Sequence, residues 1–190
     1  MTTLPFSIVG FDLDGTLFDT SGDLGAAVNH ALKLAGRPEV PGEAVYGLIG
    51  GGSRLMLRRA LALTGGEEDA DFDGLYAELL AFYEANIAVH TRHYPGGEAM
   101  LDALDAAGVR IAIVTNKPQH LTDRLLDELG LTGRFACVIG AGTFPLKPAP
   151  DALHAMVERL GGGRAASVGA SQHTRGAAAG RASFQRWASV

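Results

Sequence analysis

The chain has 190 residues, of which 47% are hydrophobic, and this is enough apolar material to build a buried core. Its 16 Lys and Arg residues against 21 Asp and Glu residues give a net charge of −5, so we expect no general attraction for nucleic acid or an anionic membrane. A single cysteine, Cys137, excludes an internal disulfide, and no apolar run approaches the roughly 20 residues of a membrane span, so we expect a cytoplasmic protein.

The first elements are a short strand followed by helices. Residues 7–11 form an apolar run bounded by polar residues, which is typical of a buried strand. From Ser21, which we expect to cap the helix, apolar residues recur at helical spacing until Gly36. Similar spacing over 55–63 and 75–87 predicts two more helices. Residues 20–90 are therefore predicted to be helical, with no good strand.

The second half of the chain alternates between strands and helices. Helices are predicted over 99–107, 121–129 and about 149–160, and strands over 109–114, 135–139 and 165–168. This alternation is typical of βαβ crossovers and a parallel sheet. We therefore predict an α/β fold in which residues 1–19 and 91–190 form a Rossmann-like core. Residues 20–90 would be a helical cap inserted after the first strand.

Three clusters of polar residues fall where predicted strands end. Asp12 and Asp14 follow the first strand, Thr115 and Asn116 follow the strand over 109–114, and Lys147 follows the strand over 135–139. In an open parallel sheet, ligands bind at the carboxyl ends of the strands. The sequence therefore predicts one polar site to which all three clusters contribute.

The two aspartates have other interpretations when they are considered alone. Asp14-Gly15 between apolar residues is typical of a turn, in which both carboxylates would be solvated. A calcium-binding loop does not fit, because Leu17 stands where that loop needs glycine and Asp23 where it needs glutamate.

The other two clusters also have simpler interpretations. Thr115 and Asn116 could be the polar lead-in to a helix that starts at Pro118, and Lys147 could be a solvated surface lysine. A helix start, however, also presents unpaired N–H groups that suit phosphate oxygens.

Three further features carry weaker signals. The glycine-rich stretch over 47–54 lacks the lysine of a Walker loop, and we expect a flexible loop before the next helix. Arg54 is either a functional contact made by the helical insertion or a surface arginine. His90 and His93 lack the additional ligands at metal spacing that a zinc site would need.

The combination of motifs resembles one large family of hydrolases. The segments that carry the resemblance are Asp12-Leu13-Asp14-Gly15-Thr16, Val114-Thr115-Asn116-Lys117-Pro118 and Lys147-Pro148. Together they are similar to motifs one to three of the haloacid dehalogenase-like hydrolase superfamily. The stretches GLIGGGSRLMLRRAL and YPGGEAMLDALDAAGVRIAIVTNKP further resemble its phosphoglycolate phosphatase group, which has a small helical cap.

This resemblance implies a mechanism and a set of site residues. Asp12 would be the nucleophile that forms an aspartyl-phosphate, and Asp14 would be the general acid and base. Thr115, Asn116 and Lys147 would bind the substrate phosphate. Magnesium would be held by Asp12 and by the backbone carbonyl of Asp14. The substrate would be a small phosphorylated metabolite, with 2-phosphoglycolate expected first, and the presence of Asp14 favours phosphate esters over haloacids.

The chain departs from this pattern at its carboxyl end. The resemblance places acidic residues where the chain has Ala170 and Thr174, and neither side chain is an anionic magnesium ligand. No acidic residue follows Glu158, and the resemblance implies a further strand and helix that this stretch does not match, so the last strand and helix of the core are expected to be missing or altered. The alternative is therefore a catalytically degenerate or truncated phosphate-binding relative without a complete metal site.

Overall fold

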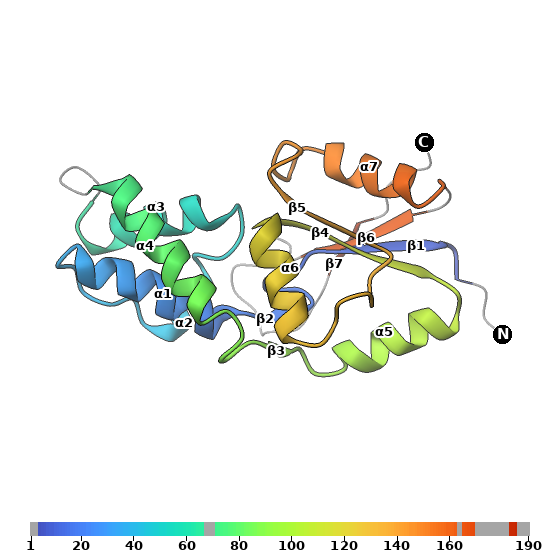
Figure 1. The fold of residues 1–190 in the computed structure, drawn as a ribbon, viewed down its shortest axis with the longest axis horizontal. Coiled ribbons are helices and arrows are strands. Elements are labelled where there is room, and N and C mark those ends of the chain that lie inside the picture. Colours follow the sequence, from blue (N-terminus) through green and yellow to red (C-terminus); the bar gives the residue numbers. More distant parts are fainter. Residues whose placement is uncertain (1–3, 67–70, 163–164, 170–182, 186–190) are drawn as a thin grey trace. The chain divides into compact units, whose positions relative to one another are not determined.

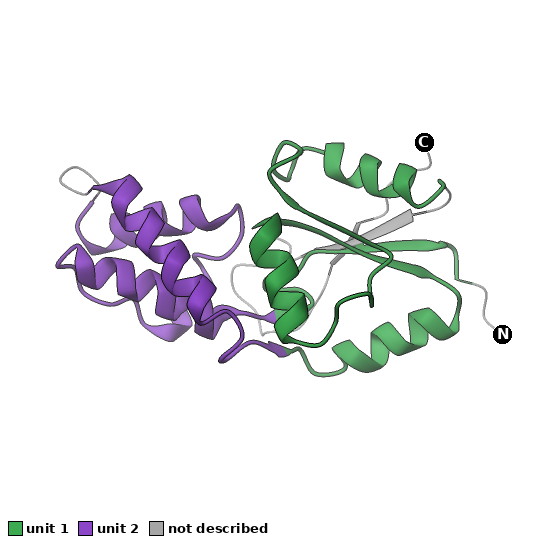
Figure 2. Cartoon of the chain, in the orientation of Figure 1, with its two compact units in different colours: residues 1–18, 93–190 green, residues 19–92 purple. Residues whose placement is uncertain are grey.

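The structure is a computed structural model that describes residues 4–66, 71–162, 165–169 and 183–185. The chain divides into two compact units (Figure 2), one formed by residues 1–18 and 93–190 and the other by residues 19–92. Short strands β2 (Phe18–Asp19) and β3 (Arg92–His93) pair with each other where the chain passes from one unit to the other. None of the helices in the described residues is long and apolar enough to cross a membrane.

The first unit is built on a mainly parallel sheet with the strand order β5-β4-β1-β6-β7 (Figure 1). Its described strands are β1 (Ile8–Phe11), β4 (Arg110–Pro118), β5 (Cys137–Ala141), β6 (Ala165–Gly169) and β7 (Ser183–Gln185). Strand β1 lies between β4 and β6 and pairs with both in parallel, whereas β7 runs antiparallel to β6. The predicted α/β class with a parallel sheet is confirmed.

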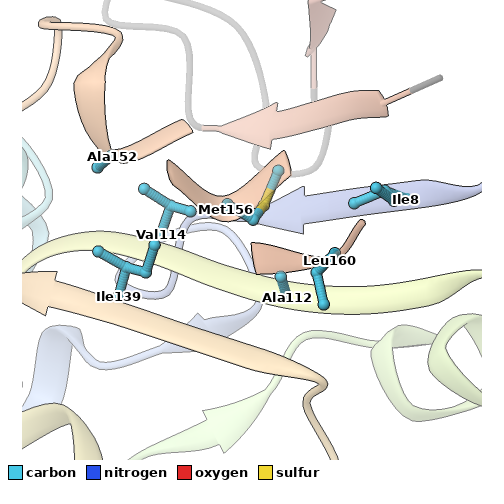
Figure 3. Packing of buried hydrophobic residues seen from close by; sticks show 7 residues of the cluster. All are labelled: Ile8, Ala112, Val114, Ile139, Ala152, Met156 and Leu160. Atoms are coloured by element: carbon cyan, nitrogen blue, oxygen red, sulfur yellow. The ribbon is translucent and has the colours of Figure 1, made fainter. Parts of the chain in front are cut away.

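Helices α5 (Gly97–Ala106), α6 (Gln119–Glu128) and α7 (Asp151–Arg159) pack on this sheet, and α7 lies on the opposite side from α5 (Figure 1). One layer of the core lies between α7 and the sheet (Figure 3) and consists of Ile8, Ala112, Val114, Ile139, Ala152, Met156 and Leu160. Burial of an Ile, Val, Leu or Met side chain in this layer contributes roughly 1.5–3 kcal/mol.

A glycine in β1 allows this close packing. A Cβ atom added at Gly10 would lie 2.6 Å from Met156 Sδ, which is closer than two such atoms pack. The missing side chain therefore lets α7 approach the central strand.

The second unit contains helices α1 (Ser21–Leu34), α2 (Gly42–Val45), α3 (Ser53–Thr64) and α4 (Phe72–Ala85). Helix α1 packs against the other three. The side chains of Val28, Leu32, Leu57, Leu61 and Leu79 are fully buried. The three long helices were expected from the apolar spacing, whereas the single turn of α2 was not.

Some element boundaries differ from the prediction. Ser21 is the first residue of α1 rather than its cap, and its N–H and hydroxyl both donate to Asp19 Oδ1. Strand β4 extends beyond Val114 to Pro118, so α6 begins at Gln119 and not at Pro118. Pairing with β5 explains the longer strand, because Pro118 lies in register with Ala141 after an irregularity in the ladder.

Candidate active site

The fold brings the ends of two neighbouring strands together. Strands β1 and β4 are parallel and in register, with Phe11 opposite Ile113. Asp12 follows Phe11 directly, and Val114 and Thr115 follow Ile113 along β4. The first two polar clusters therefore lie at the same edge of the sheet.

Lys147 joins this edge through its ammonium group. Lys147 Nζ lies 2.8 Å from Asp12 Oδ1 and donates a 2.7 Å hydrogen bond to the carbonyl of Val114. The same Asp12 oxygen accepts the N–H of Leu13 at 2.8 Å. About a quarter of each side chain in the pair is exposed, 23% for Lys147 and 24% for Asp12. The carboxylate is therefore held in a defined orientation and still reaches solvent.

Thr115 and Asn116 have different surroundings at the end of β4. Thr115 is buried, and its hydroxyl accepts the N–H of Lys117 at 3.2 Å. The side-chain amide of Asn116 makes two bonds to the main chain of Lys147. Both residues and Lys147 line one pocket, together with Gly140 and Phe144 among others.

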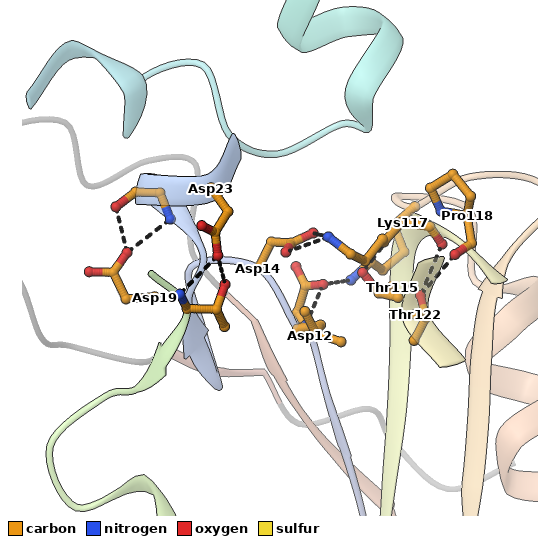
Figure 4. Close-up of polar contacts among 12 residues, drawn as sticks. Asp12, Asp14, Asp19, Asp23, Thr115, Lys117, Pro118 and Thr122 are labelled. Carbon is orange, nitrogen blue, oxygen red and sulfur yellow. Dashed lines mark hydrogen bonds and ion pairs between the residues drawn. The ribbon is translucent and has the colours of Figure 1, made fainter. Parts of the chain in front are cut away.

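Asp14 has a partner that the sequence did not indicate. Lys117 Nζ lies 3.1 Å from Asp14 Oδ1 (Figure 4), and only 3% of the lysine side chain is exposed. Lys117 belongs to the motif that suggested the family, but its spacing from Asp14 in the sequence gives no sign of the contact. The only signal was its position at the end of a strand, next to Thr115 and Asn116.

The loop after β1 turns sharply at Gly15. Gly15 has a φ of 72°, a conformation that residues with a side chain rarely adopt. The carbonyl of Leu13 accepts the N–H groups of Leu17 and Phe18 at 3.1 Å each. The turn does not leave the acids in bulk water, because Asp14 is only 18% exposed and is paired with Lys117.

The described residues offer a small set of oxygen ligands for magnesium. Magnesium is commonly held by one or two carboxylates and several waters. The Asp12 carboxylate and the backbone carbonyl of Asp14 suit this chemistry. In the part of the chain that the structure describes, no group of three or more His, Cys, Asp or Glu side chains could hold a metal ion. Ala170 and Thr174, which replace the expected acids, lie outside the described residues.

The weaker candidates from the sequence have contacts of their own. Arg54 is half exposed, forms a 2.7 Å ion pair with Asp73 and lies 5.0 Å from the ring centre of Phe72. His93 packs on Phe18, with their ring centres 4.4 Å apart. These contacts account for Arg54 and His93 without a ligand.

The fold and the edge of the sheet together define a class of protein. A parallel α/β core that carries an aspartate after its first strand, paired with a lysine from a later loop, places a carboxylate and an ammonium group where open parallel sheets bind ligands, which suits a hydrolase with an anionic substrate. The chain belongs to the haloacid dehalogenase-like hydrolase family, whose model matches residues 6–182.

Individual relatives agree with this assignment. The chain is 42% identical over 166 residues to a phosphoglycolate phosphatase of Agrobacterium fabrum. This alignment covers 85% of this chain and 71% of the relative. It is 42% identical over 164 residues to a phosphoglycolate phosphatase of Pseudomonas putida, of which it spans 59%. The resemblance seen in the motifs is thus confirmed.

A solved structure shows the same fold. The crystal structure of a predicted phosphoglycolate phosphatase from Haemophilus somnus matches with a TM-score of 0.78 and 29% sequence identity. The match covers 85% of this chain and 74% of the other.

Proposed function

We propose that this protein is a phosphatase that hydrolyses a small phosphate monoester, with 2-phosphoglycolate as its substrate. The observation that carries the proposal is the 2.8 Å contact between Lys147 Nζ and Asp12 Oδ1 at the carboxyl ends of the strands. This contact places an ammonium group beside the carboxylate that would attack phosphorus. The names of the relatives support the choice of substrate.

Two displacement steps account for the reaction. An oxygen of Asp12 attacks the phosphorus atom, and the bond between phosphorus and the leaving oxygen breaks. Asp14 gives a proton to the leaving alkoxide and later takes one from the water that attacks the aspartyl-phosphate. Inorganic phosphate is released, and the Asp12 carboxylate is restored.

The cationic and hydroxyl groups of the site assist these steps. Lys147 balances charge on the phosphoryl oxygens, and the Thr115 hydroxyl donates a hydrogen bond to one of them. Mg²⁺ held by the Asp12 carboxylate and the Asp14 carbonyl supplies further charge neutralisation when it is bound. Because the leaving oxygen needs a proton, Asp14 has to be free of Lys117 while it acts as the acid.

The second unit, residues 19–92, takes the role of a cap in this proposal. The helices in its described residues form their own buried core, so the unit is a compact body rather than a loop. The cap would then select the substrate, so that relatives with a common core and different caps act on different small phosphorylated metabolites. We expect the protein to act in the cytoplasm, in agreement with its single cysteine.

The second candidate function is phosphate binding without turnover. It is favoured by Ala170 and Thr174, which stand where the family pattern places acids. Magnesium-titrated hydrolysis of 2-phosphoglycolate and p-nitrophenyl phosphate separates the two functions, with Asp12→Asn as the blank. Turnover above the blank that rises with magnesium supports the phosphatase. Turnover equal to the blank at every magnesium concentration, together with binding of inorganic phosphate, supports the second function.

A further inference from the structure

We propose that Asn116 is a positioning residue, which acts by holding the main chain of Lys147 so that the lysine ammonium meets Asp12. The inference rests on the proposed function, because it assigns the same Asp12 and Lys147 to the reaction. It gives Asn116 a different role from the binding of substrate that the motif alone implies.

The contact between Asn116 and Lys147 is a two-bond clamp. Asn116 Nδ2 donates to the carbonyl of Lys147 at 3.1 Å, and Asn116 Oδ1 accepts the N–H of Lys147 at 2.8 Å. A backbone N–H only donates and a carbonyl only accepts, so these two partners fix which end of the amide is which. The orientation of Asn116 therefore follows from its partners.

The clamp ties the loop that carries Lys147 to strand β4. Lys147 lies between β5 and α7, and 31 residues separate it from Asn116 in the sequence. Its Nζ also donates to the carbonyl of Val114, two residues before Asn116 on the same strand. Strand β4 thus holds both ends of this lysine, the main chain through Asn116 and the ammonium through Val114.

Holding both ends has a direct effect on the site. A lysine side chain has several rotatable bonds, and a free one would spend little time against Asp12. With the main chain clamped, the remaining freedom lies in the side chain alone, and the Val114 carbonyl directs the ammonium. The 2.8 Å contact with Asp12 is the result.

A neighbouring residue offers a matched control. Gln119 Oε1 accepts the N–H of Gly140 at 2.6 Å, so it is also a side-chain amide that ties the β4 end to a neighbouring segment. It does not hold Lys147. Gln119→Ala removes a comparable bond and tests whether general loosening of this edge is enough to free the lysine.

The first measurement follows Lys147 itself. The chain has three lysines, Lys33, Lys117 and Lys147, so amine labelling followed by mass spectrometry resolves each of them, and the exposed Lys33 serves as the internal reference. We expect Asn116→Ala, which removes both bonds of the clamp, to raise the labelling of Lys147 relative to Lys33 by at least about three- to tenfold, the factor that corresponds to the loss of a single hydrogen bond. We expect Gln119→Ala to leave this ratio near its wild-type value. Asn116→Asp keeps the acceptor for the Lys147 N–H and should give an intermediate ratio; it also replaces Asn116→Ala if that variant does not fold.

The second measurement is a double-mutant cycle on kcat/KM. We expect Asn116→Ala to lower kcat/KM by up to about a hundredfold, as for a displacement of about 1 Å in a reacting group. In a Lys147→Ala background the same change should have little further effect, because a residue that acts only through Lys147 has nothing left to position.

Three outcomes would overturn the inference: an unchanged labelling ratio in Asn116→Ala, an equal rise in Gln119→Ala, or full additivity in the cycle. The labelling needs no turnover, so it decides the role of Asn116 even if the wild-type protein hydrolyses nothing. Loss of the proposed function and loss of this inference are therefore distinguished.

Discussion

Lys117 and Asp14 form an ion pair across 103 residues of sequence, with 3.1 Å between Lys117 Nζ and Asp14 Oδ1. The lysine side chain is 3% exposed and the aspartate side chain 18% exposed. Burial of two charges is tolerated because each compensates the other, and removal of one partner leaves the other charge uncompensated. This pair therefore holds the loop after β1 against the end of β4.

Lys117→Met is expected to destabilise the protein. The variant leaves the Asp14 carboxylate without its ammonium partner, and we expect a loss of about 3 kcal/mol in the free energy of unfolding, the low end of the range for a broken buried pair. Urea denaturation measures this loss. Lys33→Met, which changes an exposed lysine, is the control and should unfold close to the wild type. Equal midpoints for the two variants would contradict the role of the pair.

The second unit depends on a buried carboxylate. Asp23 is 1% exposed and accepts the N–H groups of His90 and Thr91 and the hydroxyl of Thr91, at distances from 2.8 to 3.1 Å. These bonds connect the start of α1 to the end of the same unit. The Asp23 side chain thus connects the beginning of the segment 19–92 to its end.

Asp23→Ala should therefore lower the free energy of unfolding by about 3 kcal/mol, because several buried N–H and O–H donors lose their acceptor. Thr91→Val removes only one of these bonds and should lose about 1 kcal/mol. Thermal and urea unfolding give both values. Asp73→Ala is the matched control, because Asp73 is an exposed acid whose ion pair with Arg54 contributes little. If Asp73→Ala unfolds at as low a temperature and urea concentration as Asp23→Ala, the buried hydrogen bonds are not the cause of the lost stability.

The sequence predicts the sheet and the site to different depths. The strand at β1 is recognisable as a short continuous apolar run bounded by polar residues, and the helix at α1 is recognisable because its apolar residues recur at helical spacing. Asp12, Thr115 and Lys147 could be named from sequence because polar residues follow predicted strands and match known motifs. Whether each of them acts as the resemblance implies stays a prediction.

The partners of these residues could not be predicted. Lys117 meets Asp14, and Asn116 meets the main chain of Lys147, only because separate segments are folded together. The extension of β4 to Pro118 likewise depends on pairing with β5, which no local pattern specifies. Elements of three or four residues, such as β7 and α2, are too short to show a period.

The stability of the protein should depend on the protonation of His93. Burial lowers the pKa of His93 below its ordinary value of 6.5; Arg134 adds to this effect, and Glu98 opposes it. Its Nδ1 atom is buried and has no hydrogen-bond partner among the described residues. The folded protein therefore favours neutral His93, whereas the unfolded chain takes up a proton as the pH falls below 6.5.

The sign of the effect follows directly. Neutral His93 contributes to the free energy of unfolding. This contribution is fully present above pH 6.5 and is lost as the pH falls toward the lowered pKa of His93, because the unfolded state then binds more protons. The measurement is the free energy of unfolding in urea between about pH 7.5 and pH 5. We expect this free energy to depend less steeply on pH in His93→Gln than in the wild type. His154→Gln changes an exposed histidine and should leave the slope as it is in the wild type. If both variants keep the wild-type slope, His93 does not carry it.

Ala170→Asp tests whether a missing metal ligand limits the reaction. Ala170 directly follows strand β6 in the sequence, as Asp12 directly follows β1, and Val168 of β6 lies in register with Phe11 of β1. The family resemblance places a magnesium carboxylate at Ala170. A bound divalent ion contributes several kcal/mol to the transition state, and each 1.36 kcal/mol changes the rate about tenfold, so we expect magnesium-dependent turnover to rise by about a hundredfold or more. Ala170→Asn has nearly the same shape without the charge and should raise turnover far less. Equal rates for the two variants at saturating magnesium would show that the carboxylate is not what the site lacks, and the proposed phosphate-binding function without turnover would then be the better account of the chain.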